Sequence, residues 1–206
     1  MQEDVPSRTA EAVAWMRDTD QRRDVGDRVV DDPYARLFLG PFFRTAALAL
    51  TKSGRLGHAT EARISPGLTA FVLCRHRFMD DAFTAACDEG IDQMVMLGAG
   101  YDTRAYRFAD RLKGVSVFEV DHPSTGGRKA KIVGEHPDVF PEVGITRVTI
   151  DFQTQALEDR LLSSGFEPSK RTFVFWEGVS MYLTREAVKN TMATLRELCA
   201  PGSWLT

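Results

Sequence analysis

The spacing of hydrophobic and polar positions changes near residue 90. Before it, apolar residues recur every three or four positions, which predicts helices. The predicted helices run from Thr9 to about Arg22, over a short stretch beginning with Asp32-Pro33, and from about Pro66 to Cys87. Ser7 or Thr9 can cap the first helix, and Gly90 follows the last one, where a left-handed residue favours termination. Residues 52–65 are rich in glycine and polar side chains and predict a loop.

After residue 90, short apolar runs alternate with stretches long enough for crossover helices. The predicted strands are Gln93 to Leu97, Val115 to Val120, Thr146 to Ile150 and Thr172 to Trp176. Thr184 begins a last helix, with Val188, Met192, Leu195 and Leu198 on its expected buried face. Ser203 opens a fifth strand. This order predicts an α/β fold with a Rossmann-like, doubly wound and mostly parallel sheet. We therefore expect an N-terminal helical cap or lid over residues 1–90 and a Rossmann-like domain over residues 91–206.

The long predicted helix carries a basic residue inside its apolar stripe. The stripe consists of Leu68, Phe71, Val72, Phe78, Met79, Ala82, Phe83 and Ala86. Arg75 falls within it, and burying a guanidinium group is costly unless an anion pairs with it. Two interpretations stay open: an internal salt bridge or outward-reaching side chain, and a contact with a ligand carboxylate or phosphate.

Composition narrows the class of protein. The chain has 206 residues, 43% of them hydrophobic, with a formal net charge of −3, which argues against attachment to nucleic acid or to an anionic membrane by bulk charge. No apolar run approaches the roughly 18 to 20 residues that span a bilayer, and the N-terminus does not have the order of a signal peptide. We expect a soluble, cytoplasmic protein with no nucleic-acid partner and no membrane association. Cys74, Cys87 and Cys199 are predicted to be reduced core residues, and the histidine and cysteine spacings predict no metal site.

Candidate binding residues gather where the predicted strands end, which is the edge at which doubly wound sheets bind ligands. Gly98 and Gly100 form a tight turn after the first strand. The second strand ends in Asp121, roughly 20 residues beyond the glycines, the spacing at which an acid can bind ribose hydroxyls. The remaining strand ends carry Asp151-Phe152, suited to an adenine ring, and Glu177. Each acid alone is more typical of a helix cap or a loop, but the four strand ends together favour a nucleotide-like ligand.

The residues after the glycine turn distinguish between nucleotides. A dinucleotide site favours a third glycine at the helix start, whereas Tyr101-Asp102-Thr103 follows Gly100 here and would place negative charge beside a pyrophosphate. This disfavours NAD. S-adenosylmethionine has an ammonium, a carboxylate and a sulfonium in place of phosphates, so acidic groups near the turn suit it. Arg75 and Arg104 are candidates to pair with its carboxylate.

Three longer motifs resemble those of the leucine carboxyl methyltransferase family and its bacterial S-adenosylmethionine-dependent relatives. They are Leu97-Gly98-Ala99-Gly100-Tyr101-Asp102-Thr103-Arg104, Phe118-Glu119-Val120-Asp121-His122-Pro123 and Trp176-Glu177-Gly178-Val179-Ser180-Met181-Tyr182-Leu183. Weaker similarity extends through Asp32-Pro33-Tyr34-Ala35 and the region from Cys74 to Asp81. Family members usually continue through further strands, and this chain stops where its fifth strand begins, so the resemblance implies a class I methyltransferase sheet with its C-terminal strands missing.

The resemblance also implies roles for individual residues. Arg75 holds the cofactor carboxylate, with Arg77 as the competing choice. Gly98 and Gly100 contact the methionine portion and Asp121 the ribose. Asp151 and Phe152 hold the adenine, and Glu177 holds the amino group.

The leading hypothesis is methyl transfer from S-adenosylmethionine to an oxygen nucleophile, a carboxylate of a small molecule or of a polypeptide C-terminus being the favoured acceptor. An acceptor that is already ionised needs no general base, and none is assigned. Tyr101 and Tyr182 can orient an acceptor, although packing is the commoner role for such tyrosines. Two alternatives stay open: a non-catalytic S-adenosylmethionine-binding protein, and a nicotinamide-dependent oxidoreductase.

Overall fold

The centre of the molecule is one sheet of five parallel strands. The computed structural model describes residues 7–45, 67–152 and 154–206. The strands are β1 (Gln93–Leu97), β2 (Ser116–Asp121), β3 (Ile145–Thr149), β4 (Thr172–Phe175) and β5 (Trp204–Leu205). Their order across the sheet is β3-β2-β1-β4-β5. The predicted parallel α/β sheet is confirmed, including the fifth strand, which pairs with β4 in parallel.

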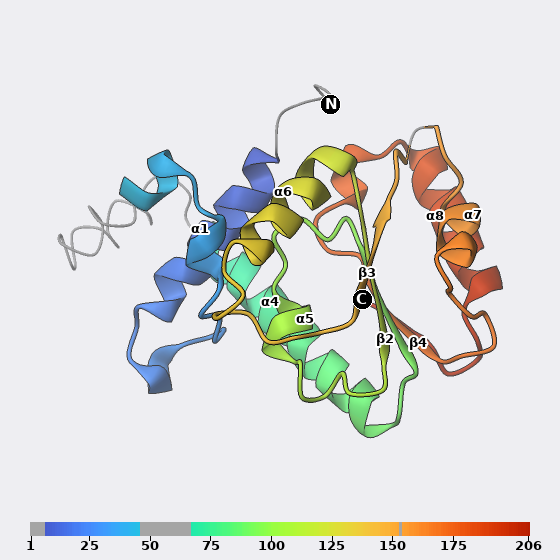
Figure 1. Cartoon of the computed structure of the whole chain (residues 1–206), viewed down its shortest axis with the longest axis horizontal. Coiled ribbons are helices and arrows are strands. Elements are labelled where there is room, and N and C mark those ends of the chain that lie inside the picture. The colour runs from blue at the N-terminus through green and yellow to red at the C-terminus, as the bar shows by residue number, and fades with distance from the viewer. Residues whose placement is uncertain (1–6, 46–66, 153) are drawn as a thin grey trace.

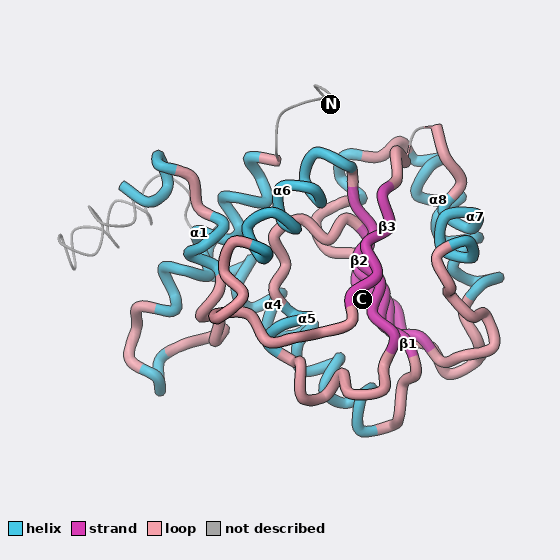
Figure 2. The backbone as a smooth tube through the Cα atoms, viewed as in Figure 1, coloured by secondary structure: helices cyan, strands magenta, loops and turns pink. Residues whose placement is uncertain are grey.

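Helices cover both faces of this sheet (Figure 1). They are α1 (Arg8–Gln21), α4 (Leu68–Asp88), α5 (Arg104–Arg107), α6 (Pro123–Gly134), α7 (Leu157–Ser163) and α8 (Arg185–Leu198). Short 3₁₀ helices are η1 (Val25–Asp27), η2 (Ala35–Phe38) and η3 (Ser180–Tyr182). Figure 2 shows the sheet nearly edge-on, with α7 and α8 on one side and α1, α4, α5 and α6 on the other. Within the part of the chain that the structure describes, no helix is long and apolar enough to cross a membrane.

Alternate residues of β1 supply two separate cores, because successive side chains of a strand point to opposite faces. Met94 and Met96 pack with α4 residues such as Phe83. Val95 and Leu97 pack on the other side with residues of α7 and α8. Burial on both faces explains why β1 and β4 are largely apolar and why their positions could be predicted.

The order of the strands reverses at β1, because β2 and β3 lie on one side of it and β4 and β5 on the other, which creates the topological switch point. β1 pairs with β2 on one side and with β4 on the other. In sheets of this kind the ligand crevice lies outside the carboxyl ends of the strands at the switch point. The residues that follow β1, β2 and β4 are therefore the ones to examine.

The caps predicted for the helices are present. The Ser7 side chain accepts a hydrogen bond from the Ala10 amide at the start of α1, and Thr184 does the same for α8. Gly90, two residues beyond α4, has φ +81°, a conformation that glycine adopts at little cost. The loop predicted over residues 52–65 lies outside the described residues.

The predicted apolar stripe of α4 is partly wrong. Leu68, Phe71 and Phe78 are exposed. The buried residues are Val72, Leu73, His76, Met79, Asp80, Phe83 and Ala86. The buried face contains polar side chains because ionic partners from distant segments satisfy them. A face chosen by hydrophobicity alone was therefore rotated away from the real one.

Two smaller predictions are also corrected. Cys74, expected in the core, is an exposed free cysteine on α4, whereas Cys87 and Cys199 are half-buried and free. On α8, Met192 is exposed and Thr191 is buried in its place. The Thr191 hydroxyl donates a hydrogen bond to the Ala187 carbonyl oxygen, 2.9 Å away, which lets this small polar residue occupy a core position.

Candidate functional site

The turn after β1 is shaped by its two glycines. Gly98 has φ +66° and Gly100 has φ +49°, conformations that side chains with a Cβ atom rarely adopt. The amides of Gly98 and Ala99 both donate to the Val120 carbonyl oxygen, at 2.8 and 3.1 Å. The glycine turn is thereby fixed against the end of β2.

Asp121, at the end of β2, lies directly against this turn. One of its carboxylate oxygens accepts from the Gly100 amide at 2.5 Å, and the other accepts from the His122 amide at 2.6 Å. Burial raises the pKa of Asp121, and these backbone hydrogen bonds only partly offset that effect. The structure therefore brings together the glycine turn and the acid that the sequence assigned to the ribose.

Asp151 and Phe152 follow β3 on the far side of Asp121. The Ile150 amide donates to the Asp121 carbonyl oxygen at 3.0 Å, so the two strand ends are adjacent. The Asp151 amide donates to the side-chain oxygen of Gln155 at 2.9 Å. Phe152 is half-buried and packs against the core beneath α7 and α8. Both residues lie at the same edge of the sheet as Asp121.

Glu177, which follows β4, receives charged groups from two elements. The Nε atom of Arg75 on α4 lies 3.0 Å from its Oε1 atom, and an Nη1 atom of Arg104 lies 2.8 Å from its Oε2 atom. The Nδ1 atom of His76 lies 3.1 Å from Oε2. Burial alone would raise the pKa of Glu177, but the charge of Arg104 and the hydrogen bond from His76 outweigh it and lower the pKa. Glu177 is therefore a fixed carboxylate.

Arg104 is the centre of this ionic cluster. It is 0% exposed, and it contacts Asp80 at 2.6 Å and Asp102 at 2.5 Å in addition to Glu177. Burial would raise the pKa of Asp102, and the charge of Arg104 more than reverses that effect. The sequence offered Arg104 as a partner for a ligand carboxylate. Its full burial among three protein carboxylates gives it an internal role instead.

The positions of Arg75 and Arg77 differ in a way that bears on which of them could bind the cofactor carboxylate. Arg75 reaches from α4 to Glu177, and its side chain is 28% exposed. Arg77 points away from the strand ends and pairs with Asp81 one turn along α4, with 57% of its side chain exposed. Of the two, Arg75 is the one located at the strand ends.

Sequence reasoning missed two buried polar residues of the cluster. His76 is 1% exposed and Asp80 is 6% exposed, although both lie in a helix read as apolar on that face. Burial, together with the nearby charge of Arg104, lowers the pKa of His76, so its ring is neutral near pH 7. Their positions three to four residues from Val72, Met79 and Phe83 were the available signal, because buried polar residues in such a stripe imply partners elsewhere.

Tyr101 and Tyr182, the two tyrosines that the sequence offered for orienting a methyl acceptor, have different surroundings. Tyr101 is 2% exposed and stacks on Phe38 with ring centroids 5.2 Å apart. Tyr182 is exposed, and its hydroxyl donates to Thr9 Oγ1 at 2.8 Å. Tyr101 is therefore a packing residue, while Tyr182 links η3 to the start of α1.

A buried ion pair in the N-terminal segment is hydrogen-bonded to the turn that follows β1. Arg17 of α1 pairs with Asp32 at 2.8 Å and donates to the Tyr101 carbonyl oxygen at 2.5 Å. Asp32 also accepts from the Thr103 hydroxyl at 2.7 Å. The weakly similar Asp32-Pro33-Tyr34-Ala35 segment thus has a structural task, which is to hold the turn that follows β1.

Among the described residues, one cluster of three side chains has ligand atoms close enough together to surround a cation. Ligand atoms of His76, Asp102 and Glu177 lie within 4.8 Å of one another. The Nη1 atom of Arg104, however, already lies against one oxygen of Asp102 and one of Glu177. A cation there would have to share these oxygens with a buried guanidinium group, so the cluster has the character of an ion-pair network.

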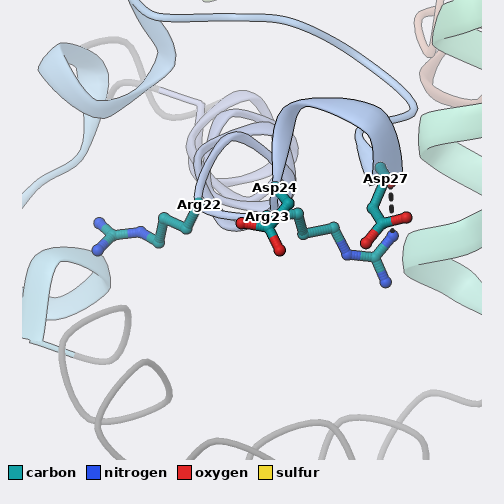
Figure 3. Close-up of a pocket in the computed structure, with 4 residues that line it drawn as sticks. All are labelled: Arg22, Arg23, Asp24 and Asp27. Carbon is teal, nitrogen blue, oxygen red and sulfur yellow. Dashed lines mark hydrogen bonds between the residues drawn. The ribbon is translucent and has the colours of Figure 1, made fainter.

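Two cavities differ in their relation to these residues. A hollow of about 540 Å³ at the end of α1 is lined by Arg22, Arg23, Asp24 and Asp27, whose side chains form its wall in Figure 3. It lies away from the strand ends. A smaller cavity of about 120 Å³ adjoins Asp121 and Gly100. Its walls include the buried ion pair of Lys129 and Glu119, whose charged atoms are 2.7 Å apart. Of these two cavities, the smaller one is the one at the strand ends.

The fold and the strand-end residues place the chain among parallel α/β proteins with a ligand edge at the switch point. The crystal structure described as that of a "putative methyltransferase from Thermobifida fusca YX" shares this fold, with a TM-score of 0.55 and 18% identity, over 93% of this chain and 64% of the other. The family model for leucine carboxyl methyltransferase matches residues 10–196. The chain belongs to the leucine carboxyl methyltransferase family, as the sequence motifs indicated.

Two relatives from other organisms align with most of this chain. A protein of Saccharopolyspora erythraea is 35% identical over 201 residues, which cover 95% of this chain and 64% of the relative. A protein of Parafrankia sp. is 33% identical over 204 residues, covering 96% and 61%. Both carry the name "Putative S-adenosyl-L-methionine-dependent methyltransferase". The chain therefore spans less than two thirds of the length of these two relatives.

Proposed function

We propose that this chain binds S-adenosylmethionine at the carboxyl ends of its strands and is part of a methyltransferase. The methyl acceptor is an oxygen nucleophile, with a carboxylate as the favoured acceptor. The observation that carries the proposal is the convergence of the Gly98–Gly100 turn and Asp121 on one side of β1 with Arg75 and Glu177 on the other. Family membership and the names of the relatives support it.

The charges at this edge suit the two ends of the proposed cofactor. Arg75 is a guanidinium able to bind a carboxylate in a planar, two-pronged arrangement. Glu177 is a carboxylate held ionised, which suits an ammonium group. Asp121 offers oxygens to ribose hydroxyls, and Asp151 with Phe152 offers an acceptor and an aromatic ring to the adenine. Arg77 has no part in this assignment because it points elsewhere.

When bound, S-adenosylmethionine supplies an electrophilic methyl group, and its transfer forms an oxygen–carbon bond as the carbon–sulfur bond breaks, with the bonding electrons going to sulfur. The contribution of the protein is to hold the two reactants in line, an effect worth about 7 to 11 kcal/mol of the barrier. A carboxylate acceptor needs no deprotonation, so no general base is assigned. The extra length of the relatives leaves room for acceptor-binding parts beyond this chain.

The nicotinamide alternative fits the charges less well. A pyrophosphate carries two negative charges and is favoured by exposed amides at a helix N-terminus. Here the turn leads into Asp102, which is held ionised by Arg104, and Asp121 lies beside it. These two carboxylates beside the turn disfavour a pyrophosphate there. A non-catalytic S-adenosylmethionine-binding protein remains the second candidate, because the chain spans only part of its relatives.

Isothermal titration with S-adenosylhomocysteine and with NADH tests the proposal. We expect micromolar binding of the first ligand and none of the second. Asp121→Ala should weaken binding at least about tenfold, the effect of losing charged hydrogen bonds to ribose. Asp110→Ala is the matched control, because Asp110 is exposed and pairs only with Lys113. Tight NADH binding would reject the proposal. Transfer of a labelled methyl group to any carboxylate acceptor would exclude the non-catalytic alternative.

A further inference from the structure

Arg104 uses its whole hydrogen-bonding capacity inside the protein. Its Nε atom donates to Asp80 and its Nη1 atom to Asp102 and Glu177. Its Nη2 atom donates to the His76 carbonyl oxygen at 3.2 Å and to the Met79 sulfur at 4.0 Å, which accounts for all five N–H groups. Its guanidinium carbon lies 4.6 Å from the centre of the Phe175 ring. A residue with 0% exposure and no remaining donor cannot touch a ligand.

The acidic partners of Arg104 come from three separate segments. Asp80 lies on α4, Asp102 in the turn after β1, and Glu177 in the segment after β4. Arg107 also pairs with Asp80, at 2.7 Å, and Arg75 pairs with Glu177. Three carboxylates are thus matched by three guanidinium groups, and the neutral His76 lies among them. Of these three arginines, Arg104 is the one that contacts both Asp102 and Glu177.

We propose that Arg104 is a positioning residue that orients Glu177, as an ionised carboxylate, toward the amino-acid end of the cofactor. The inference rests on the proposed function. Arg104 binds the Oε2 atom of Glu177, while Arg75 approaches the Oε1 atom. Arg104 therefore sets the orientation of the Glu177 carboxylate without contacting the ligand itself. A lysine would keep the charge but could not span three carboxylates, because its ammonium is a point charge without a planar fork.

The alternative is that Arg104 only supports the fold. Two ligands separate the two roles. S-adenosylhomocysteine carries the amino-acid end, and 5′-methylthioadenosine has the same adenosine and sulfur but lacks that end. A positioning role acting through Glu177 affects only the first ligand. A general loss of structure affects both.

The experiment is isothermal titration of the unaltered chain and of Arg104→Lys with both ligands, with circular dichroism on each sample. We expect Arg104→Lys to raise the Kd for S-adenosylhomocysteine about ten- to hundredfold, as for one lost hydrogen bond between charged groups. The Kd for 5′-methylthioadenosine should stay within about twofold. Arg107→Lys is the matched control, because Arg107 belongs to the same cluster through Asp80, to which its Nη1 and Nη2 atoms both donate, and not through Glu177. It should leave both affinities within about twofold.

A second variant applies if Arg104→Lys does not fold. Asp102→Asn keeps an oxygen for the Arg104 amide, which donates to Oδ1 at 2.8 Å, but removes the charge that holds Nη1. It should weaken S-adenosylhomocysteine several-fold and leave 5′-methylthioadenosine unchanged. The inference is overturned if folded Arg104→Lys binds both ligands as the unaltered chain does or loses both equally, or if Asp102→Asn shows no selective loss. An unaltered chain that binds neither ligand would instead reject the proposed function, and this inference with it.

Discussion

Val179 lies directly over Gly98. A Cβ atom built on Gly98 would lie 2.2 Å from the Cγ2 atom of Val179, a distance at which one of them must shift. Gly98 belongs to the turn assigned to the methionine portion of the cofactor, so Val179 occupies the approach to that turn. The cavity beside Asp121 measures about 120 Å³, well below the roughly 300 Å³ of the smallest usual ligand pockets. We therefore expect a ligand that reaches the Gly98 turn to displace Val179 and the segment after β4.

Shortening Val179 should ease that movement. We expect Val179→Ala to bind S-adenosylhomocysteine about two- to tenfold more tightly, because less apolar contact over Gly98 has to be broken when the ligand enters. Titration calorimetry measures the change. Val139→Ala, at an exposed valine elsewhere, should have no effect. Weaker binding by Val179→Ala would show that Val179 instead contacts the bound ligand.

Asp80 should be the most sensitive acid for stability, since it pairs with two arginines and is buried. Removing its charge leaves Arg104 and Arg107 under-compensated, and breaking a buried pair of this kind costs about 3 to 5 kcal/mol of unfolding free energy. Urea unfolding of Asp80→Asn at pH 7 tests this. The control is Asp88→Asn, because Asp88 pairs with Arg111 at the surface and should contribute about 1 kcal/mol or less.

The same variant has a defined pH dependence. Burial would raise the pKa of Asp80, but the charges of Arg104 and Arg107 lower it below its usual value. A lowered pKa in the folded state stabilises the protein above the unfolded pKa, and this stabilisation is lost as pH falls through the folded pKa. The stability difference between Asp80→Asn and the unaltered chain should therefore shrink on acidification below about pH 4. A difference that grows there would contradict the assignment.

The Thr103 hydroxyl links the glycine turn to the N-terminal segment, and we expect this one hydrogen bond to contribute to the free energy of unfolding. Its Oγ1 atom donates to the buried Asp32 carboxylate, which also pairs with Arg17. Thr103→Val removes the donor at nearly constant volume and should cost about 1.5 to 3 kcal/mol of unfolding free energy. Thr45→Val, at an exposed threonine, should change stability by less than about 0.5 kcal/mol. Denaturant unfolding that gives equal values for the two variants would show that the Thr103 link carries no energy.

β1, β2 and β4 were predictable because each is mostly apolar and buried along most of its length, with a glycine or an acid at its end or shortly after it. β3 differs, because Thr146, Arg147 and Thr149 are exposed. β1 has the predicted bounds, and β2, β3 and β4 differ from theirs by one residue at one or both ends. The exposed and buried faces of α4 were not predictable from hydrophobicity, because His76 and Asp80 are buried among partners distant in sequence. Arg104 lies 24 residues from Asp80 and Glu177 lies 101 residues from His76. Such pairs depend on the tertiary fold and leave no periodic signal. The position of Val179 over Gly98 could not be predicted either, because it also depends on the tertiary fold.

Asp121 should control how ligand affinity depends on pH. Burial raises its pKa above that of an ordinary aspartate, so protonation begins at a higher pH than usual. A protonated Asp121 loses acceptor capacity for ribose hydroxyls, and affinity for S-adenosylhomocysteine should fall by up to about tenfold per pH unit below that pKa. Glu177 should not contribute in this range, because its own pKa is lowered.

Titrations from pH 8 down to the lowest pH at which the chain stays folded, on the unaltered chain and on Asp121→Asn, check this expectation. The asparagine variant should bind more weakly at pH 8 and show no loss on acidification. A raised folded-state pKa makes stability fall as pH rises between the unfolded and folded values, so protonation of Asp121 does not itself promote unfolding there. Circular dichroism at each pH would confirm that the chain is folded. If the asparagine variant keeps the full pH dependence, the titrating group is another residue, and the assignment of Asp121 to the ribose loses its support.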